Sequence, residues 1–272
     1  MDIITHTLSG VAAGTAVANF SRNGISDKTK IVLFAGFGAF IPDLDALSLW
    51  SGFDSTIGSI LNLVNSGKNI YFAKLWYSHH AFMHSLPAGV FLAVLLSLLT
   101  AVLSRFGSNN NGISGKSFKE FLIRQKFIFL AFMCGYIMHL LGDLPTPSCV
   151  WGGVNMFWPL KTYVGGTGDI WWWNNYDIFI IALVVSIINC SVILTGICKT
   201  KSYKCLTLFV FTLGFFICLY QIKNRDANFN YIGHTPDYHI YEEKSKKIQK
   251  DILGEYLYNI MDKLDKKIPL YF

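Results

Sequence analysis

Histidine and aspartate residues fall into four short groups that lie within or beside apolar segments of the chain. The motifs are THT, PDLD, HHAFMH and HLLGD, and the candidate ligands in them are His6, Asp43, Asp45, His79, His80, His84, His139 and Asp143. Imidazole nitrogen with carboxylate oxygen, and without thiolate, suits Zn²⁺, Mn²⁺ or Fe²⁺. So many ligands exceed one tetrahedral shell, which predicts two or three ions, as in centres that clamp the attacking and leaving oxygens of a phosphoryl displacement.

Two of these groups have a spacing that places two ligands on one face of a helix. His139 and Asp143 are four residues apart, and so are His80 and His84. Side chains at this spacing are neighbours on a helix surface, so the two members of each pair can reach the same ion. His79 would then have to lie in the loop ahead of the helix.

The aspartates of PDLD stand near the end of an apolar stretch long enough to cross a bilayer. A carboxylate at the bilayer centre costs about 2.5–3.5 kcal/mol on insertion scales, so Asp43 and Asp45 must lie near an interface, line a polar cavity or bind a cation. Pro42 ends regular helical hydrogen bonding just before them, and both carboxylates can then turn toward one cavity.

Each group also has a purely structural explanation. A lone His6 near a helix start is more often a hydrogen-bonded histidine than a ligand, and the HLLGD pair could simply hold two helices together. The set taken as a whole favours metal binding. The motif GHTPDYH near the C-terminus, with His234 and His239, is a second candidate cluster, but these are better interpreted as surface loop residues.

The composition is typical of a membrane protein. Of 272 residues, 52% are hydrophobic and only 15% are charged, against about 25% charged in ordinary soluble domains. The six cysteines form no CxxC pair and are read as small buried apolar residues, not as disulfides or a thiolate site. The net charge of +6 is spread over loops and tail, so it indicates topology and a lipid surface, and no nucleic-acid partner is expected.

Six segments approach the roughly 17–25 residues needed to span hydrocarbon. We expect an all-α, polytopic membrane bundle, with the metal site in residues 1–222 and a polar tail over residues 223–272. In the first segment, Gly10 and Gly14 predict close helix packing. The three segments that carry His and Asp are the weaker candidates, and these could be buried or interfacial helices. The six are Ile3–Phe20, Ile31–Trp50, Leu86–Leu103, Phe127–Leu144, Ile178–Ile197 and Leu206–Ile222.

The tail contains one amphipathic pattern, over residues 242–268. It predicts a helix with lysines opposite its apolar face, lying either on the membrane or on the extracytoplasmic loops. The apolar positions are Ile248, Ile252, Tyr256, Leu257, Ile260, Leu264 and Ile268.

Lysine and arginine alternate between rich and poor loops. The first, third and fifth loops are rich, which places them in the cytoplasm and all the candidate ligands near the outer face of the inner membrane. Lys223 and Arg225, just after the last span, argue mildly against this orientation. The even loops are rich in aromatic residues, which we interpret as an interfacial belt in preference to substrate stacking. They include Trp76, Tyr77, Trp151, Phe157, Trp158, Trp171, Trp172 and Trp173.

The ordered motifs DIITHTLSG, FIPDLD, HHAFMHS and GYIMHLLGDLPTPSCVWGGVNMFWPL resemble the successive signatures of the YdjM-like family of membrane-bound metal-dependent hydrolases, over roughly residues 1–165. The family commonly has Arg then Gly where this chain has His80 and Ala81, so His80 could replace that arginine or bind metal. The resemblance implies the metal set His6, Asp43, Asp45, His79, His84, His139 and Asp143, with Ser85 and Thr146 as polar support.

The family is more remotely similar to zinc-dependent phospholipases C and S1/P1-type nucleases. This implies a phosphoesterase that works through a metal-activated water, most simply on Zn²⁺. The expected depth of the site in the membrane favours a lipid or lipid-linked substrate. Asp45, Asp143 or His80 would accept the proton or orient a ligand. Two alternatives stay open: a metal-ion transporter, which would need polar residues across the whole membrane, and a non-catalytic scaffold stapled by metal.

Overall fold

The computed structural model describes residues 1–21, 24–106, 118–195, 201–235 and 237–267. These residues are predominantly helical and contain isolated β-bridges but no strand. The helices are α1 (Ile3–Phe20), α2 (Ile25–Phe40), the 3-10 helix η1 (Ile41–Leu49), the π-helix η2 (Asp54–Gly58), α3 (Gly67–Tyr71), the 3-10 helix η3 (Phe82–His84), α4 (Leu86–Phe106), α5 (Phe118–Asp143), α6 (Tyr176–Leu194), α7 (Lys201–Lys223) and α8 (Tyr238–Lys267).

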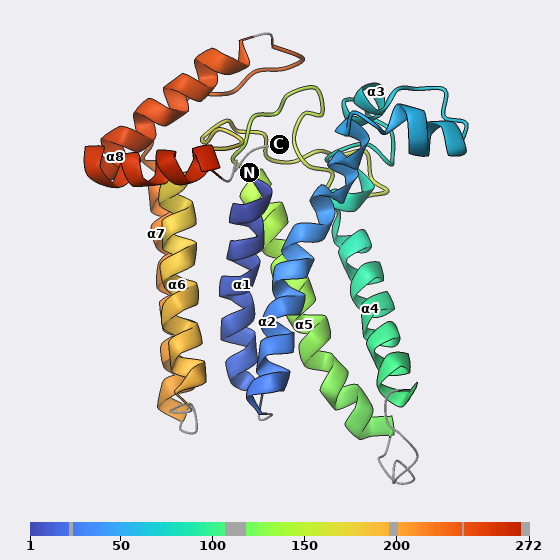
Figure 1. The fold of residues 1–272 in the computed structure, drawn as a ribbon, viewed down its shortest axis with the longest axis vertical. Helices are drawn as coiled ribbons and strands as arrows, with labels where there is room; N and C mark the ends of the chain where they lie inside the picture. Colours follow the sequence, from blue (N-terminus) through green and yellow to red (C-terminus); the bar gives the residue numbers. More distant parts are fainter. Residues whose placement is uncertain (22–23, 107–117, 196–200, 236, 268–272) are drawn as a thin grey trace.

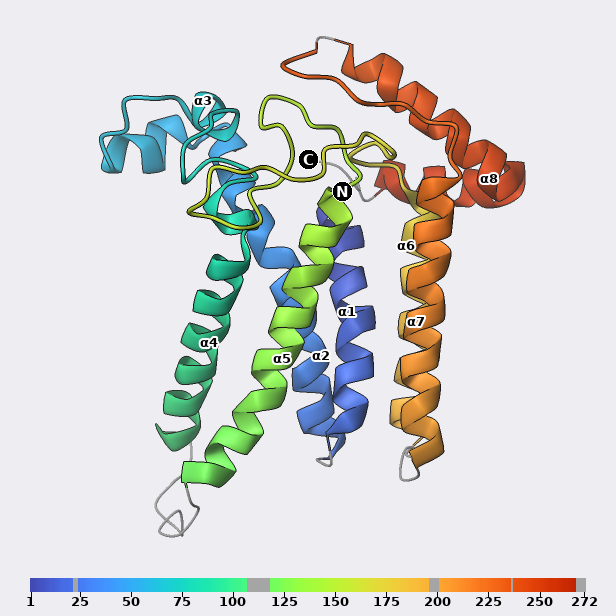
Figure 2. The same ribbon diagram turned by 180° about the vertical axis from the view of Figure 1, so that it is seen from behind.

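The long helices run side by side, and everything else gathers at one end of them (Figures 1 and 2). At this end α1 begins, α2 continues into η1, and α5 ends. Helices α3 and α8 and the connection between α5 and α6 cover the same end. The ends of the segments that carry the candidate ligands therefore meet under a cover of loops and short helices.

Four helices among the described residues are long and apolar enough to cross a membrane, which confirms the helical membrane character. Helix α1 agrees with its expected bounds but is not one of the four, and the apolar part of α4, Leu86–Thr100, is shorter. The four are Ile25–Leu49, Gln125–Asp143, Tyr176–Leu194 and Cys205–Lys223.

The structure confirms the predicted end of regular helical hydrogen bonding at Pro42. Helix α2 ends at Phe40, and the chain tightens into the 3-10 helix η1 with Pro42 in its first positions. A proline has no N–H to donate and its ring crowds the preceding turn, so the regular α-helical ladder stops there. The change of helix type occurs just before Asp43.

Helices α1, α2 and α5 approach one another backbone to backbone. A Cβ placed on Gly10 would lie 2.5 Å from the Ala39 Cβ, and one on Gly14 would lie 2.5 Å from the Ala35 Cβ. On α5, a Cβ on Gly135 would lie 1.8 Å from the Ala35 carbonyl oxygen. Small residues at these contacts confirm the packing role predicted for Gly10 and Gly14.

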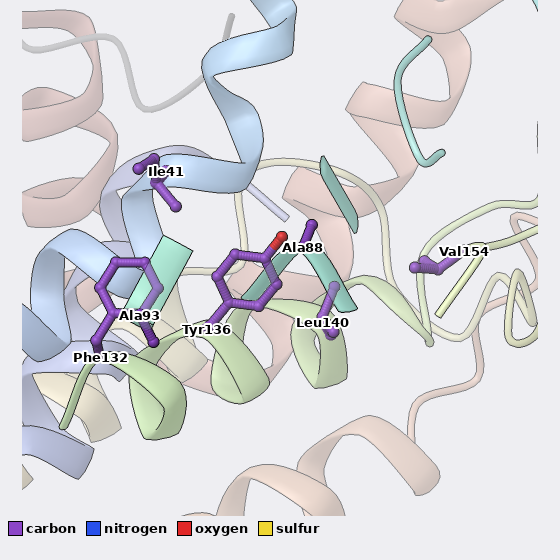
Figure 3. Packing of buried hydrophobic residues seen from close by; sticks show 7 residues of the cluster. All are labelled: Ile41, Ala88, Ala93, Phe132, Tyr136, Leu140 and Val154. Atoms are coloured by element: carbon purple, nitrogen blue, oxygen red, sulfur yellow. The ribbon is translucent and has the colours of Figure 1, made fainter. Parts of the chain in front are cut away.

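A second packing region joins α5 to α4 and to the segment that carries the histidines (Figure 3). Tyr136 is fully buried in it, and its hydroxyl donates to the carbonyl of Met83, the residue before His84. This contact fixes the short helix η3 against α5. The core residues shown are Ile41, Ala88, Ala93, Phe132, Tyr136, Leu140 and Val154.

The tail forms helix α8, but its apolar residues do not make one continuous stripe. The backbone breaks at Gly254, which has a φ of 72°. Tyr256 is 82% exposed and Ile260 is 47% exposed, whereas Met261 is buried against Tyr176 of α6. Ile248, Ile252, Leu257 and Leu264 are half-buried, and Ile268 lies outside the described residues. Helix α8 thus rests on the end of the bundle.

A buried ion pair ties the chain after α7 to the start of α6. The Arg225 guanidinium donates to both carboxylate oxygens of Asp177, at 2.6 and 2.7 Å, and to the side-chain oxygen of Asn175, at 2.8 Å. The Arg225 and Asp177 side chains are only 2% and 3% exposed. Arg225 is therefore a paired structural charge, and it no longer counts as a free juxtamembrane cation in the choice of orientation.

Replacing Arg225 with alanine is expected to destabilise the protein by about 3–5 kcal/mol, because the Asp177 carboxylate would stay buried without its partner. The change should appear as a lower Tm of the full chain in detergent. The exposed pair of Lys250 with Glu255 provides the control, since Lys250→Ala should change stability by no more than about 0.5 kcal/mol. Equal shifts in the two variants would contradict the structural role of Arg225.

Candidate metal centre

All of the candidate ligands predicted from the sequence meet in one cluster. His6 comes from the first turn of α1, the PDLD aspartates from η1, and the HLLGD pair from the last turns of α5. The remaining histidines come from the loop before α4 and from η3. Each member lies within ion-pair distance or ring contact of another: His6, Asp43, Asp45, His79, His80, His84, His139 and Asp143.

Five of the six distances among four ligand atoms of the cluster are close to those within a tetrahedral shell. The Nε2 atoms of His84 and His139 are 3.2 Å apart. The Asp43 Oδ1 atom lies 3.5 and 3.6 Å from these two nitrogens, and the Asp143 Oδ2 atom lies 3.6 and 3.1 Å from them. Ligands bound tetrahedrally at about 2.0–2.2 Å are roughly 3.3–3.6 Å apart. These four atoms could therefore hold one Zn²⁺-sized ion.

In His139 and His80, the Nδ1 atom makes a hydrogen bond to a backbone carbonyl, and the Nε2 atom remains available to bind a metal ion. The Nδ1 atom of His139 lies 2.7 Å from the Ala39 carbonyl oxygen, and that of His80 lies 3.1 Å from the Gly153 carbonyl oxygen. A carbonyl oxygen only accepts, so both Nδ1 atoms carry the proton and both Nε2 atoms keep a lone pair. Outer partners of this kind commonly orient metal-binding histidines.

Asp45 lies behind two histidines and does not line the cavity. Its Oδ1 atom accepts from the Nδ1 atom of His79 at 2.7 Å, and its Oδ2 atom is 3.2 Å from the Nδ1 atom of His84. Asp43, by contrast, contacts Nε2 atoms and lines the cavity. The two aspartates of PDLD thus have different positions, and that of Asp45 suits orientation of rings.

His6 stacks on His139, with ring centroids 3.8 Å apart, and its Nε2 atom lies 2.9 Å from the Asp143 Oδ1 atom. The amino group of Met1 donates to the same oxygen at 2.8 Å. Sequence reasoning missed this amino group, because a chain terminus has no motif. Asp143 therefore presents one oxygen to α1 and the other to the histidines of the cluster.

His79, His80 and His84 form a second group whose ligand atoms lie within 4.8 Å of one another. His80 has a φ of 61°, in the left-handed region that a histidine rarely adopts, and such backbone is common at functional sites. Burial, and then the neighbouring His79 and His84, hold the pKa of His80 well below its usual range. A neutral His80 offers its Nε2 lone pair without first losing a proton.

The neighbouring carboxylates stabilise the protonated form of the His84 imidazole. Burial alone would lower the pKa of this imidazole, but the charge of Asp45 and the hydrogen bonds of Asp43 and Asp45 raise it to about 10. A divalent cation bound nearby would supply this positive charge in place of the proton.

Several buried polar atoms of the cluster have no hydrogen-bond partner among the described residues. They include the Nδ1 atom of His6 and the Oδ2 atom of Asp143. Buried polar atoms in folded proteins are nearly always paired, and an ion at the site is one explanation for such exceptions. The donor set, its spacing and these atoms all fit a bound cation.

The hydroxyl groups predicted as polar support bond to the backbone and not to ligand side chains. Ser85 donates to the Phe82 carbonyl at 2.7 Å and accepts from the Ala88 N–H. Thr146 donates to the Asp143 carbonyl at 2.7 Å. Both hold the backbone at places where a helix begins or ends beside the cluster.

A cavity of about 680 Å³ opens over the cluster, with Asp43, Asp143, His79 and His80 at its base. Its walls are aromatic, and they correct part of the belt interpretation. Trp151 is only 2% exposed, and its ring lies 4.9 and 4.6 Å from those of His79 and His80.

Other aromatic residues and the tail motif also differ in position. Trp171 is fully buried, so it too lies outside a belt, whereas Trp76 is 61% exposed and remains compatible with one. Both histidines of GHTPDYH are exposed, as the surface interpretation predicts, but His239 lies in the first turn of helix α8 and the loop residue His234 lines the cavity.

Comparison with known proteins identifies the family of the chain. No curated protein and no solved structure gives a match. A family model described as YdjM inner membrane protein matches residues 1–225, which extends the resemblance beyond the motifs through the last long apolar helix. The matched region contains every residue of the cluster. The chain therefore belongs to the YdjM inner membrane protein family.

Proposed function

We propose that this protein is a membrane-bound, metal-dependent hydrolase that cleaves a phosphoester of a lipid or lipid-linked substrate. The observation that carries the proposal is the convergence of the His84 and His139 Nε2 atoms, each of which lies 3.1–3.6 Å from the other and from one carboxylate oxygen each of Asp43 and Asp143. A buried set of this kind, open to a cavity on one side, has the arrangement of a catalytic metal site.

Asp43, His84, His139 and Asp143 would hold the first cation, and His79 with His80 would supply the ligands of a second one beside it. Such ions, when bound, lower the pKa of a coordinated water toward 7 and polarise a phosphoryl oxygen. The chain orients the ligands through Ala39, Gly153 and Asp45. Of the three carboxylates, only Asp43 and Asp143 line the cavity, so these two are placed to accept a proton from water.

An apolar cleft supports a lipid substrate. It has a volume of about 370 Å³ and is lined by residues of α1, α5, α6 and α7, including Ala12, Leu141, Ala182 and Phe215. Met1 lines both this cleft and the polar cavity. A chain in the cleft would thus hold the attached phosphoester at the boundary where the cluster lies.

The membrane arrangement in this proposal has six spans: the four long apolar helices together with α1 and α4. Lys28 and Lys30 lie near the start of α2, and Lys201 and Lys204 start α7. These helix ends are opposite to the end that holds the cluster (Figure 2). By the positive-inside rule the cluster then faces the extracytoplasmic side of the inner membrane.

The packing below the cluster counts against a transport path. Helices α2 and α5 touch where Gly135 meets Ala35, and α1 meets α2 at Gly14. A transported ion would need polar groups or space beyond this region. The alternatives still have distinct signatures: metal uptake into proteoliposomes that depends on Asp43 for a transporter, and metal-dependent stability without turnover for a scaffold.

His139→Ala is expected to remove bound transition metal and to reduce phosphoester hydrolysis to background, because it deletes one donor of the four-atom set. Elemental analysis of purified full-length protein and a screen of lipid phosphoesters measure the two effects. His239→Ala is the control, since this histidine is exposed and does not line the cavity. Wild-type protein without stoichiometric metal, or full turnover by His139→Ala, would refute the proposal.

Asp45→Asn is expected to weaken metal binding or activity by about 10- to 100-fold, the usual effect of removing an outer partner of a ligand. Asp43→Asn should have the larger effect, because it removes a direct donor. Competition with a chelator measures the affinities, and exposed Asp237 provides an Asp→Asn control. If Asp45→Asn were the more severe change, Asp45 would be a ligand in its own right.

Cys218→Phe is expected to raise the KM for long-chain phosphoesters and to leave short-chain substrates unaffected, because it fills the apolar cleft. Ile217→Phe adds the same bulk at the neighbouring position, which is exposed and outside the cleft. Hydrolysis of matched lipids with six-carbon and sixteen-carbon chains gives the comparison. Equal effects of the two variants would exclude the cleft as the binding place of the chain.

A further inference from the structure

The mouth of the polar cavity carries an ammonium group and an imidazole that the proposed chemistry does not use. Lys68 of α3 and His234 of the tail both line the cavity and are exposed. Lys68 forms no ion pair with any described residue. Two other cations at this end are paired, Lys223 with Asp169 and Arg225 with Asp177.

An unbroken row of ring contacts connects the base of the cavity to this mouth. The ring of His79 stacks on that of Tyr71 at 4.4 Å, and Tyr71 contacts Phe72 at 4.9 Å. Phe72 in turn contacts His234, with ring centroids 4.6 Å apart, and stacks on Trp151 at 5.6 Å. His234 thus lies at the far end of an aromatic row that begins at the candidate ligand His79.

We propose that Lys68 and His234 form a binding site for a second anionic group, carried on the headgroup of the substrate beyond the scissile phosphoester. The inference rests on the proposed function for the identity of the reacting group. With the lipid chain in the apolar cleft and the phosphoester at the metal cluster, the headgroup extends toward Lys68. The ammonium group then forms an ion pair with a headgroup carboxylate or phosphate, and the His234 ring adds a hydrogen bond.

The elements that provide this site lie outside the metal-binding motifs. Lys68 is in the short helix α3, between PDLD and the histidine motif. His234 and Thr235 follow the last residue matched by the family model, which is residue 225. Lys68 itself lies within the matched residues, so only the His234 side of the proposed site lies beyond the region that the family model covers.

The test compares phosphatidylserine with phosphatidylethanolamine, because these probes share a phosphoester and differ by one headgroup carboxylate. Wild-type protein is expected to have a lower KM for phosphatidylserine. Lys68→Ala should raise that KM about five- to tenfold, in line with the loss of one hydrogen bond of ordinary strength at an exposed site. The KM for phosphatidylethanolamine and both kcat values should be unchanged, and Lys68→Arg should restore the preference. His234→Ala should give a smaller change in the same direction.

Lys74→Ala is the matched control, since the Lys74 ammonium lies over the Tyr163 ring at 5.5 Å and does not line the cavity. Binding of O-phosphoserine and phosphoethanolamine to the metal-loaded full chain, measured by calorimetry, tests the same site without turnover. Tighter binding of O-phosphoserine that Lys68→Ala abolishes would support the site even if no lipid were hydrolysed. Turnover of both lipids with equal KM values, unaffected by Lys68→Ala, would overturn the inference and leave the proposed hydrolase intact.

Discussion

Three carboxylates and five imidazoles buried at one end of a helical bundle impose the constraint on which the rest of this structure depends. Asp43, Asp45 and Asp143 have side chains only 12%, 6% and 3% exposed. A buried ion that loses its hydration costs several kcal/mol unless a partner compensates it. The amino group of Met1 and the histidines supply part of that compensation, and the pKa of His84, raised to about 10, shows that the site still favours positive charge.

This constraint explains why the cluster is built from helix ends. In the middle of the bundle, backbone N–H and carbonyl groups are already paired within the helices. At the ends, carbonyl groups remain available, and two of the rings are oriented by the carbonyls of Ala39 and Gly153. The small residues along α1, α2 and α5 bring those ends close enough to share ligands. The contact between Gly135 and Ala35 therefore positions the site as well as the core.

Much of this organisation could be predicted from the sequence, because periodicity and residue type report on it directly. The bounds of α1 and the set of residues that would converge are examples. The separate positions of Asp43 and Asp45 could not be predicted, since they depend on which nitrogen of each histidine faces inward. The location of Trp151 was missed for a related reason: an aromatic residue in a loop has the same signal whether it faces lipid or a ligand. Likewise, His234 was assigned to the surface because its contact with Phe72 joins segments distant in the chain.

The apolar cleft and the polar cavity suit chemically different parts of one substrate. The apolar cleft among α1, α5, α6 and α7 suits a hydrocarbon chain, whereas the cavity above it has ionisable groups at its base and at its mouth. Met1 borders both, so an amphiphile is the class of molecule that can occupy them together. The buried pair of Arg225 with Asp177 anchors the segment that leads to His234. The position of the cavity mouth thus depends on the same bundle that positions the ligands, although α3 and the tail contribute its side chains.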